Sequence, residues 1–188
     1  MLAEQQERPI ADEKRVEVFS LSAVLGREID KLGKRIKELE KELMYAGQGV
    51  SQAEFEAKKA PALGQLELLR QEQKQLSDLS VETIKNPEAL KKVVEYFDKR
   101  SVESAKKLST LWERNEKEKN EKGPAFQKYE PLQKMLKDAE ALQSKEIAAV
   151  VKETISKSEY GLMLGEAEKE STDLQRYQDI AIEFKLRS

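Results

Sequence analysis

Three glutamates at alternate positions, Glu166, Glu168 and Glu170, come closest to a chemical site by residue type and spacing. Carboxylates can bind a hard metal ion or act as an acid–base pair. The stretch lacks the Asp-rich, glycine-containing loop of an EF-hand, and the chain has no histidine for the Glu-x-x-His pairs of a di-iron bundle. Charged residues are abundant in every segment, so a solvated helix face is the favoured interpretation.

A phosphate-binding loop is the second chemical possibility, because Gly26 and Gly33-Lys34 look like part of a Gly-x-x-x-x-Gly-Lys motif. Six residues separate these glycines instead of four, and Arg35 stands where the motif has a magnesium-binding Ser or Thr. The segment has helical periodicity, and a helix already uses the backbone amides that such a loop must expose. We therefore exclude a phosphate loop.

Three basic doublets, Lys91-Lys92, Lys99-Arg100 and Lys106-Lys107, recur about two helical turns apart. They could follow a phosphate backbone, with Tyr96 or Trp112 available for base stacking. Acidic residues alternate with the doublets, and residues 85–122 contain eleven basic and eight acidic side chains. A mixed surface is favoured over binding to nucleic acid or a membrane surface, which is kept as the alternative function.

The composition narrows the function classes further. Among 188 residues, 34 basic and 36 acidic side chains give a net charge of −2, so bulk attraction to polyanions is not expected. Cysteine and histidine are both absent, which removes thiol chemistry, disulfides and the commonest general base. We expect no enzyme activity, no catalytic or metal-binding residues and no cofactor. With 38% hydrophobic and 37% charged residues, the chain suits long solvated helices.

Apolar residues at steps of three and four predict one long helix in the first part of the chain, after a flexible lead over residues 1–15. The members of this seam are Leu21, Leu25, Ile29, Leu32, Ile36, Leu39 and Leu43. Gly47-Gln48-Gly49 ends the helix, and Ser51 with Glu54 forms a capping box that starts a second helix. Pro61 suggests that the regular part of this helix begins there. It carries Leu63, Leu66, Leu69, Leu76 and Leu79.

Two amphipathic helices joined by a short turn favour an antiparallel coiled-coil hairpin over residues 16–80. The alternative is a parallel homodimer, because alternating Ile and Leu in the seam suits a two-stranded coiled coil. Arg35 and Glu40 occupy the positions that make flanking ion pairs in such a dimer. The connection is short and the second stripe is sustained, so we favour the monomeric hairpin.

Residues 81–188 are predicted to form a helical bundle region that packs on or extends the hairpin. Asn86-Pro87-Glu88 starts a third helix, whose charged tail over residues 113–122 is expected to project into solvent. An aromatic connector with Phe126, Tyr129 and Pro131 leads to a fourth helix, which carries an apolar stripe. The stripe members are Leu132, Leu136, Ala139, Leu142, Ile147, Val150, Val151 and Ile155. Residues 160–165 then break or kink the chain before a last helical stretch.

Two single features have both a structural and a functional interpretation. Trp112, the one tryptophan, could anchor an interface, but its spacing with Leu108 and Leu111 favours core. Gly161 and Gly165 match Gly-x-x-x-Gly, a motif that has force only within an apolar membrane segment. Outside such a segment the motif indicates a flexible or tightly packed joint.

The sequence therefore predicts an all-α protein, an elongated bundle of four to five helices built on the long hairpin. The favoured function is a non-catalytic scaffold or adaptor that presents amphipathic helix faces to a partner protein. Small GTPases and secretion or chaperone machinery are examples of such partners. Membrane insertion is not expected, since the longest aliphatic run is residues 147–151. The polar N-terminus lacks a signal-peptide core, so we expect a cytoplasmic location, with signal-less export left open.

Overall fold

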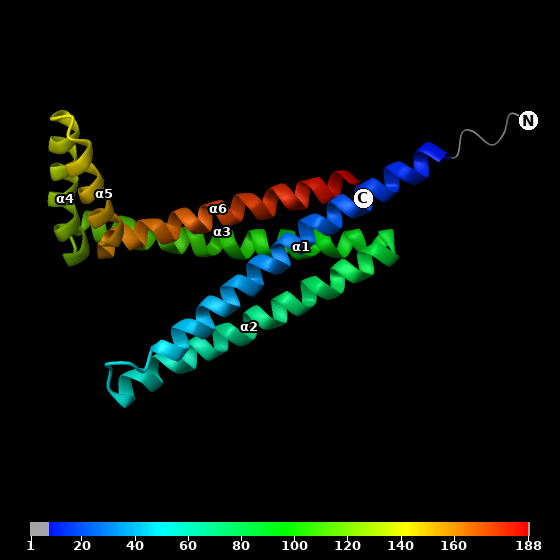
Figure 1. The fold of residues 1–188 in the computed structure, drawn as a ribbon, viewed down its shortest axis with the longest axis horizontal. Coiled ribbons are helices and arrows are strands. Elements are labelled where there is room, and N and C mark those ends of the chain that lie inside the picture. The colour runs from blue at the N-terminus through cyan, green and yellow to red at the C-terminus, as the bar shows by residue number, and fades with distance from the viewer. Residues whose placement is uncertain (1–7, 188) are drawn as a thin grey trace, which may run out of the picture. The chain divides into compact units, whose positions relative to one another are not determined.

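The computed structural model describes the backbone of residues 8–187 and the side chains of residues 22–186, except residues 84, 85 and 87. Over these residues the chain forms six α-helices and one 3-10 turn, with no strand (Figure 1), which confirms the all-α prediction. The helices are α1 (Arg8–Tyr45), α2 (Gln52–Lys85), α3 (Leu90–Asn120), α4 (Pro124–Ala141), α5 (Lys145–Lys157) and α6 (Glu159–Arg187), and Pro87–Ala89 forms the 3-10 turn.

The chain divides into two compact units, and the boundary between them in the sequence falls within α3. One unit runs up to Val93 and includes Arg187, whereas the other comprises Val94–Leu186. The first unit contains α1 and α2, and the second contains most of α3 together with α4, α5 and nearly all of α6.

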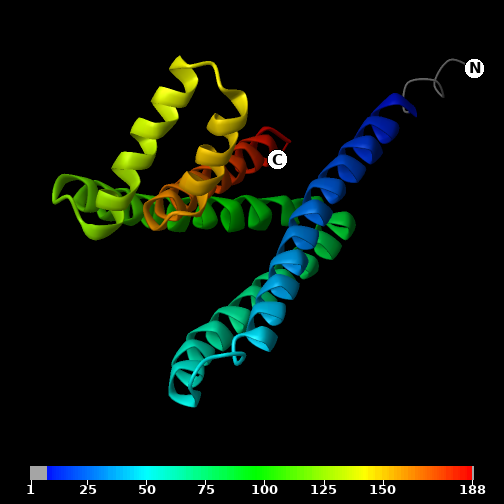
Figure 2. The ribbon, with the colours of Figure 1, turned by 60° about the vertical axis from the view of Figure 1, so that its left-hand side comes forward.

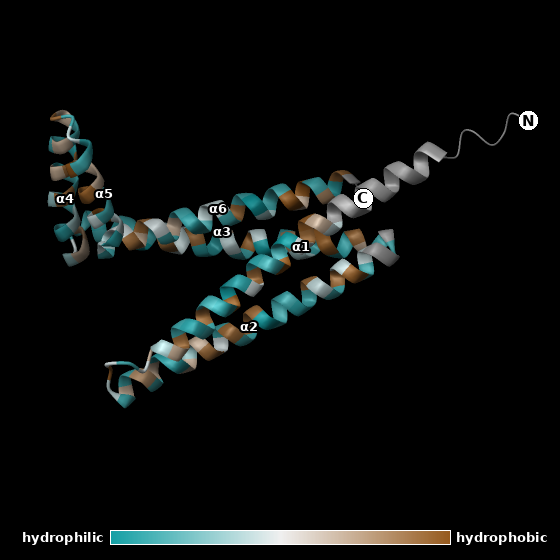
Figure 3. Ribbon diagram, in the orientation of Figure 1, coloured by the Kyte–Doolittle hydropathy of each residue, from teal (hydrophilic) through white to brown (hydrophobic). Residues whose placement is uncertain are grey.

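In the first unit, α1 and α2 lie side by side and run in opposite directions (Figures 1 and 2). Hydrophilic and hydrophobic residues alternate along the coloured parts of both helices (Figure 3). Ile36 forms a buried cluster with Leu66 and Leu69, against which other seam leucines pack. Two polar contacts also join the helices. The Arg70 guanidinium lies 2.7 Å from the Glu40 carboxylate, and the Gln73 side chain donates a hydrogen bond of 3.3 Å to the backbone carbonyl of Ile29.

The ends of these helices differ in part from the prediction. Helix α1 begins at Arg8, so residues 8–15, expected in the lead, are helical; residues 1–7 and the Leu21 side chain lie outside the described residues. The Ser51–Glu54 capping box is present. Helix α2 begins at Gln52 and continues through Pro61. The expectation that its regular part begins at the proline was therefore wrong.

In the second unit, α3 and α6 pack through large apolar side chains. Phe97 and Phe184 are fully buried, with ring centroids 6.3 Å apart. Leu108, Leu111 and Ala167 form a second buried cluster along the same interface. Buried and half-buried residues follow one another at steps of three and four along this interface, which keeps one side of a helix against its partner. On α3 they are Phe97, Ser101, Ser104, Leu108 and Leu111.

The charged end of α3 exposes most of its side chains to solvent and packs on α6 through one side. The Arg114 guanidinium lies 3.1 Å from the Glu166 carboxylate. Asn115 is buried, and its side-chain amide donates a 3.1 Å hydrogen bond to the carbonyl of Met163. Most side chains of residues 113–122 are exposed, as expected, but a buried asparagine and a cross-helix ion pair continue the α3–α6 contact into this segment.

Trp112 is 56% exposed, so its assignment to the core was wrong, whereas Leu108 and Leu111 are buried as expected. One residue advances a helix by about 100°. Trp112 follows Leu111 directly and is turned away from the side that faces α6.

The region between α3 and α6 contains two helices where one was expected, which raises the count from four or five to six. The predicted aromatic connector, with Phe126, Tyr129 and Pro131, is the first part of α4. This helix ends before Gln143, whose φ of 54° is left-handed. A second break falls at Ser158, and Gly161 and Gly165 both lie inside α6.

Candidate protein interaction site

Helices α4 and α5 lie side by side in opposite directions and form a two-helix arm, residues 124–157 (Figure 2). The buried side chains that these helices contribute are small: Ala125 and Ala139 from α4, and Ala148 and Val151 from α5. Because alanine buries little apolar surface, the two helices cover only part of each other's apolar side chains. Larger apolar residues of the arm remain at its surface.

The base of the arm is held firmly. The Glu118 carboxylate, at the end of α3, accepts hydrogen bonds from the backbone amides of Ala125 (2.8 Å) and Phe126 (3.2 Å), which are otherwise unpaired in the first turn of α4. The Tyr160 ring, at the start of α6, contacts the rings of Phe126 and Tyr129 at centroid distances of 5.2 and 4.8 Å. These contacts fix the arm where it leaves α3 and joins α6.

Tyr160 is buried, and its hydroxyl donates a hydrogen bond of 3.3 Å to the backbone carbonyl of Asn115. Burial raises the pKa of this phenol above its ordinary value, with smaller contributions from Tyr129 and the negative charge of Glu118. The phenol is therefore a neutral structural group near neutral pH and not a base or nucleophile.

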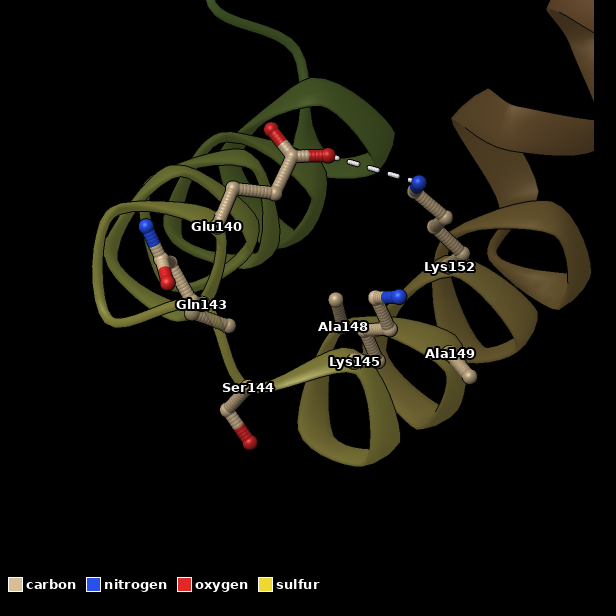
Figure 4. Close-up of a pocket in the computed structure, with 8 residues that line it drawn as sticks. Glu140, Gln143, Ser144, Lys145, Ala148, Ala149 and Lys152 are labelled. Atoms are coloured by element: carbon tan, nitrogen blue, oxygen red, sulfur yellow. Dashed lines mark ion pairs between the residues drawn. The ribbon is translucent and has the colours of Figure 1, made fainter.

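One side of the arm is closed by an ion pair. The Lys152 ammonium on α5 lies 3.3 Å from the Glu140 carboxylate on α4, across a hollow of about 500 Å³ (Figure 4). Alanines line much of this hollow, and Gln143, Ser144 and Lys145 complete its rim. We call this side the bridged face.

The other side of the arm carries large aliphatic side chains. On α5, Ile147, Val150 and Thr154 follow one another at steps of three and four, so they share one side of the helix. Lys145, Ala149 and Lys152 share the opposite flank, which is the bridged face. On α4, Leu132 lines the same groove as Val150 and Thr154, and Met135 follows Leu132 by three positions, which is one turn along the helix. We call this side the open face, defined by Leu132, Met135, Leu142, Ile147, Val150 and Thr154.

Exposure distinguishes the open face from the rest of the arm. Leu142 is 79% exposed, Val150 65%, Ile147 55% and Met135 53%. Between the two helices runs a groove of about 490 Å³, with Leu132 on one wall and Val150 and Thr154 on the other. Single exposed hydrophobic residues are normal, but a group on one surface marks an interaction site.

Charged side chains lie toward both ends of the open face. Lys128 lies one turn before Leu132 on α4, and Lys157 and Glu153 line the end of the groove near α6. Lys157 is 2.6 Å from Glu153, whereas Lys128 makes no ion pair among the described side chains. Lys128 therefore places a positive charge near Leu132, and the exposed Asp138, three positions after Met135 and four before Leu142, places a negative charge toward the far end.

The residues that the sequence raised as chemical candidates serve in helix packing or lie at the surface. Glu166 pairs with Arg114, and Glu170 pairs with Lys107 at 2.7 Å while also accepting a hydrogen bond from Ser104. Glu168 is exposed. Gly26 and Gly33 lie within α1, so the phosphate-loop motif is helical. Gly33 is in close contact with the Gln73 amide, since a Cβ there would approach it to 2.9 Å.

Each of the three basic doublets contains a residue that forms an ion pair. Lys92 is 2.8 Å from Glu82, Arg100 is 3.1 Å from Glu103, and Lys107 is engaged by Glu170. The doublets therefore present less positive charge than the sequence suggests. Sequence reasoning missed the open face, although Ile147, Val150 and Ile155 were recognised as apolar. Periodicity identified the stripe but did not show which members face α4.

No protein-family model, curated protein or solved structure matches this chain. None of the helices within residues 8–187 combines the length and the apolar composition that a bilayer span requires.

Proposed function

We propose that this protein is a non-catalytic interaction module, a scaffold or adaptor that binds a partner protein through the open face of the arm. The observation that carries the proposal is the grouping of four aliphatic side chains, each more than half exposed, on one side of a helix pair whose fully buried side chains are three alanines and one valine. Burying such side chains is favourable by about 1.5–3 kcal/mol each when they leave water completely.

Contacts at the base of the arm support the proposal that the arm presents the open face to a partner. The Glu118 cap and the aromatic contacts of Tyr160 hold its base, so a partner meets a surface with little freedom to lose on binding. The alternative function, a membrane-surface or nucleic-acid binder using the α3 doublets, has weaker support because acidic side chains pair with Lys92, Arg100 and Lys107.

In the same proposal, α1 and α2 form an antiparallel coiled-coil hairpin within one chain, and the protein is a monomer before it meets its partner. Glu40, a flanking position in the dimer alternative, pairs instead with Arg70 of the same chain. Spin labels at Lys31 and Lys74, diluted with unlabelled protein, test this arrangement. A short distance within one chain is expected, and a separation of many tens of ångströms would favour the parallel dimer.

Photo-crosslinking tests the function. A benzoylphenylalanine placed at Ile147 in the full chain should crosslink one discrete protein in the native cell, which mass spectrometry can identify. The variant Val150→Asp should reduce this product at least tenfold, because it puts a charge into the apolar contact. Val102→Asp is the matched control, since Val102 on α3 is similarly exposed at 54% but lies outside the arm. Equal crosslinking in both variants would contradict the proposal.

A further inference from the structure

We infer that the open face receives a single amphipathic α-helix of the partner, with its apolar side in the groove and an acidic residue over the base of the arm. This inference rests on the proposed function and specifies the element that the partner supplies. Three properties of the open face support it: the shape of the groove, the types of side chain that line it, and the distribution of charge along it.

The shape of the open face suits a rod-like ligand. At 1.5 Å per residue, α4 with 18 residues and α5 with 13 are about 27 and 20 Å long. The groove between them is lined by Leu132 of α4 and by Val150 and Thr154 of α5. Met135 follows Leu132 by three positions and Ile147 precedes Val150 by three, so each lies one turn further along the same helix. A third helix lying in such a groove places its side chains between the ridges of both neighbours, as in a three-helix bundle.

The lining excludes the other common modes of peptide recognition. An added β-strand needs a sheet edge with unpaired backbone groups, and both walls of the groove are helices. A Pro-rich segment needs aromatic walls, whereas this groove is lined by Leu132, Val150 and Thr154 with polar residues at its end. Phosphorylated motifs need clustered arginines, and residues 124–158 contain none. An amphipathic helix in an aliphatic groove remains.

Charge gives the bound helix a direction. Lys128, one turn before Leu132 on α4, makes no ion pair among the described side chains, whereas Lys157 of α5 is paired with Glu153. Toward the opposite end Leu142 and Ile147 are exposed, and Asp138, one turn from Leu142 on α4, carries a negative charge. A partner helix with a carboxylate at one end and aliphatic residues at i, i+3, i+4 and i+7 matches this distribution.

The extent of the open face argues against a second copy of this chain as its occupant. Its exposed aliphatic side chains offer on the order of a few hundred Å². A stable interface buries roughly 800 Å² on each partner. Pairing two flat arms would use only this patch, whereas a single helix can enter the groove and contact both walls.

The test uses the full chain and three synthetic peptides of about 18 residues, labelled with fluorescein. The first is an amphipathic Leu/Ala helix with two glutamates at one end, the second has lysines in place of the glutamates, and the third is the first with a central proline that breaks the helix. Fluorescence anisotropy measures the affinity of each. We expect the acidic-end helix to bind at least tenfold more tightly than either of the others.

Variants of the protein test whether the peptide binds at the open face and in the proposed direction. Lys128→Glu should reverse the preference between the acidic-end and lysine-end helices, and Val150→Asp should weaken binding of the acidic-end helix at least tenfold. Val102→Asp should leave it unchanged. Equal binding of the proline-containing peptide, or binding that persists in Val150→Asp, would overturn the inference. Concentration-dependent dimerisation that Val150→Asp abolishes would also overturn it, in favour of a second copy.

The photo-crosslinking experiment separates this inference from the proposed function. If a partner crosslinks at Ile147 through a segment that is extended when bound, the proposed function stands and the helix inference fails. If crosslinking to Ile147 does not depend on Val150, the proposed function itself fails.

Discussion

Two helix pairs in the same unit follow the same antiparallel plan but differ in what fills their interfaces. The α3–α6 pair buries Phe97 and Phe184 completely, together with Leu108 and Leu111. The arm buries mainly alanines and leaves larger side chains such as Val150 outside. The size of the apolar side chains between two helices therefore decides whether the pair buries its own apolar surface or leaves part of it exposed for another molecule to cover. Stability resides in α3–α6, and recognition is proposed for the arm.

The largest expected effect is a difference in the free energy of unfolding between a variant in the α3–α6 interface and a variant on the open face of the arm. Phe97→Ala should lower the free energy of unfolding by about 3–5 kcal/mol, because it opens a cavity in a fully buried site. Val150→Ala, at a position 65% exposed, should change it by less than about 0.5 kcal/mol. Urea unfolding followed by circular dichroism measures both. Similar losses for the two variants would mean that the open face is buried in the folded protein.

A pair of glycine substitutions sharpens the comparison at the joint between arm and α6. A Cβ built on Gly161 would overlap the backbone carbonyl oxygen of Ile155, whereas one on Gly165 meets nothing within 4 Å. Gly161→Ala should therefore cost about 3 kcal/mol, since the overlapping atom belongs to the backbone. Gly165→Ala should stabilise the protein by about 0.5–1 kcal/mol, as alanine does within a helix. Thermal unfolding of both variants should show shifts of opposite sign.

Replacement of the buried asparagine tests whether polar contacts help to fix α3 on α6. Asn115→Ala should destabilise the protein by about 1–3 kcal/mol, because the carbonyl of Met163 loses its hydrogen-bond donor. Asn120, the exposed last residue of α3, is the control, and its replacement by alanine should have little effect. Equal unfolding midpoints for the two variants would contradict a role for Asn115 in this contact.

The smallest expected effect is a pH dependence at the base of the arm. Because burial raises the pKa of the Tyr160 phenol, the folded state binds its proton more tightly than the unfolded chain does. The associated stability is present below about pH 10, the ordinary pKa of tyrosine, and is lost as pH rises through the raised value. Tyr160→Phe should remove a late step from the absorbance titration near 295 nm. An unchanged titration would place the ionisation elsewhere.

The regular parts of the fold could be predicted because periodicity alone determines them. The seam through Leu25 and Ile36 is buried, and the capping box at Ser51 begins α2. The break at Gln143 was missed because neither glycine nor proline marks it. Trp112 was misassigned because a shift of one residue turns a side chain from core to solvent, a difference that spacing with Leu108 does not resolve.

The open face could be predicted only in part. Ile147 and Val150 belong to the same apolar stripe as Val151, yet only Val151 is buried. Which of these residues faces inward depends on where α4 crosses α5, and that crossing depends on the turn at residues 142–144. A sequence pattern gives the amphipathic character of each helix but not the rotation of one helix against the other.

The arm begins and ends close together, since Tyr160 after α5 contacts Phe126 and Tyr129 at the start of α4, and this has a consequence for the order of folding. Contacts between α3 and α6 join residues as far as 87 positions apart, as in Asp98 and Lys185, whereas Glu140 and Lys152 within the arm are near neighbours in sequence. Closing a long loop costs more entropy than closing a short one, so the arm is expected to form first and to shorten the loop that α3 and α6 must close. Pulse-labelled hydrogen exchange should then protect α4 and α5 before α6, and the reverse order would refute this sequence of events. The surface proposed for recognition would exist before the core that supports it, exposed to whatever meets the chain during synthesis.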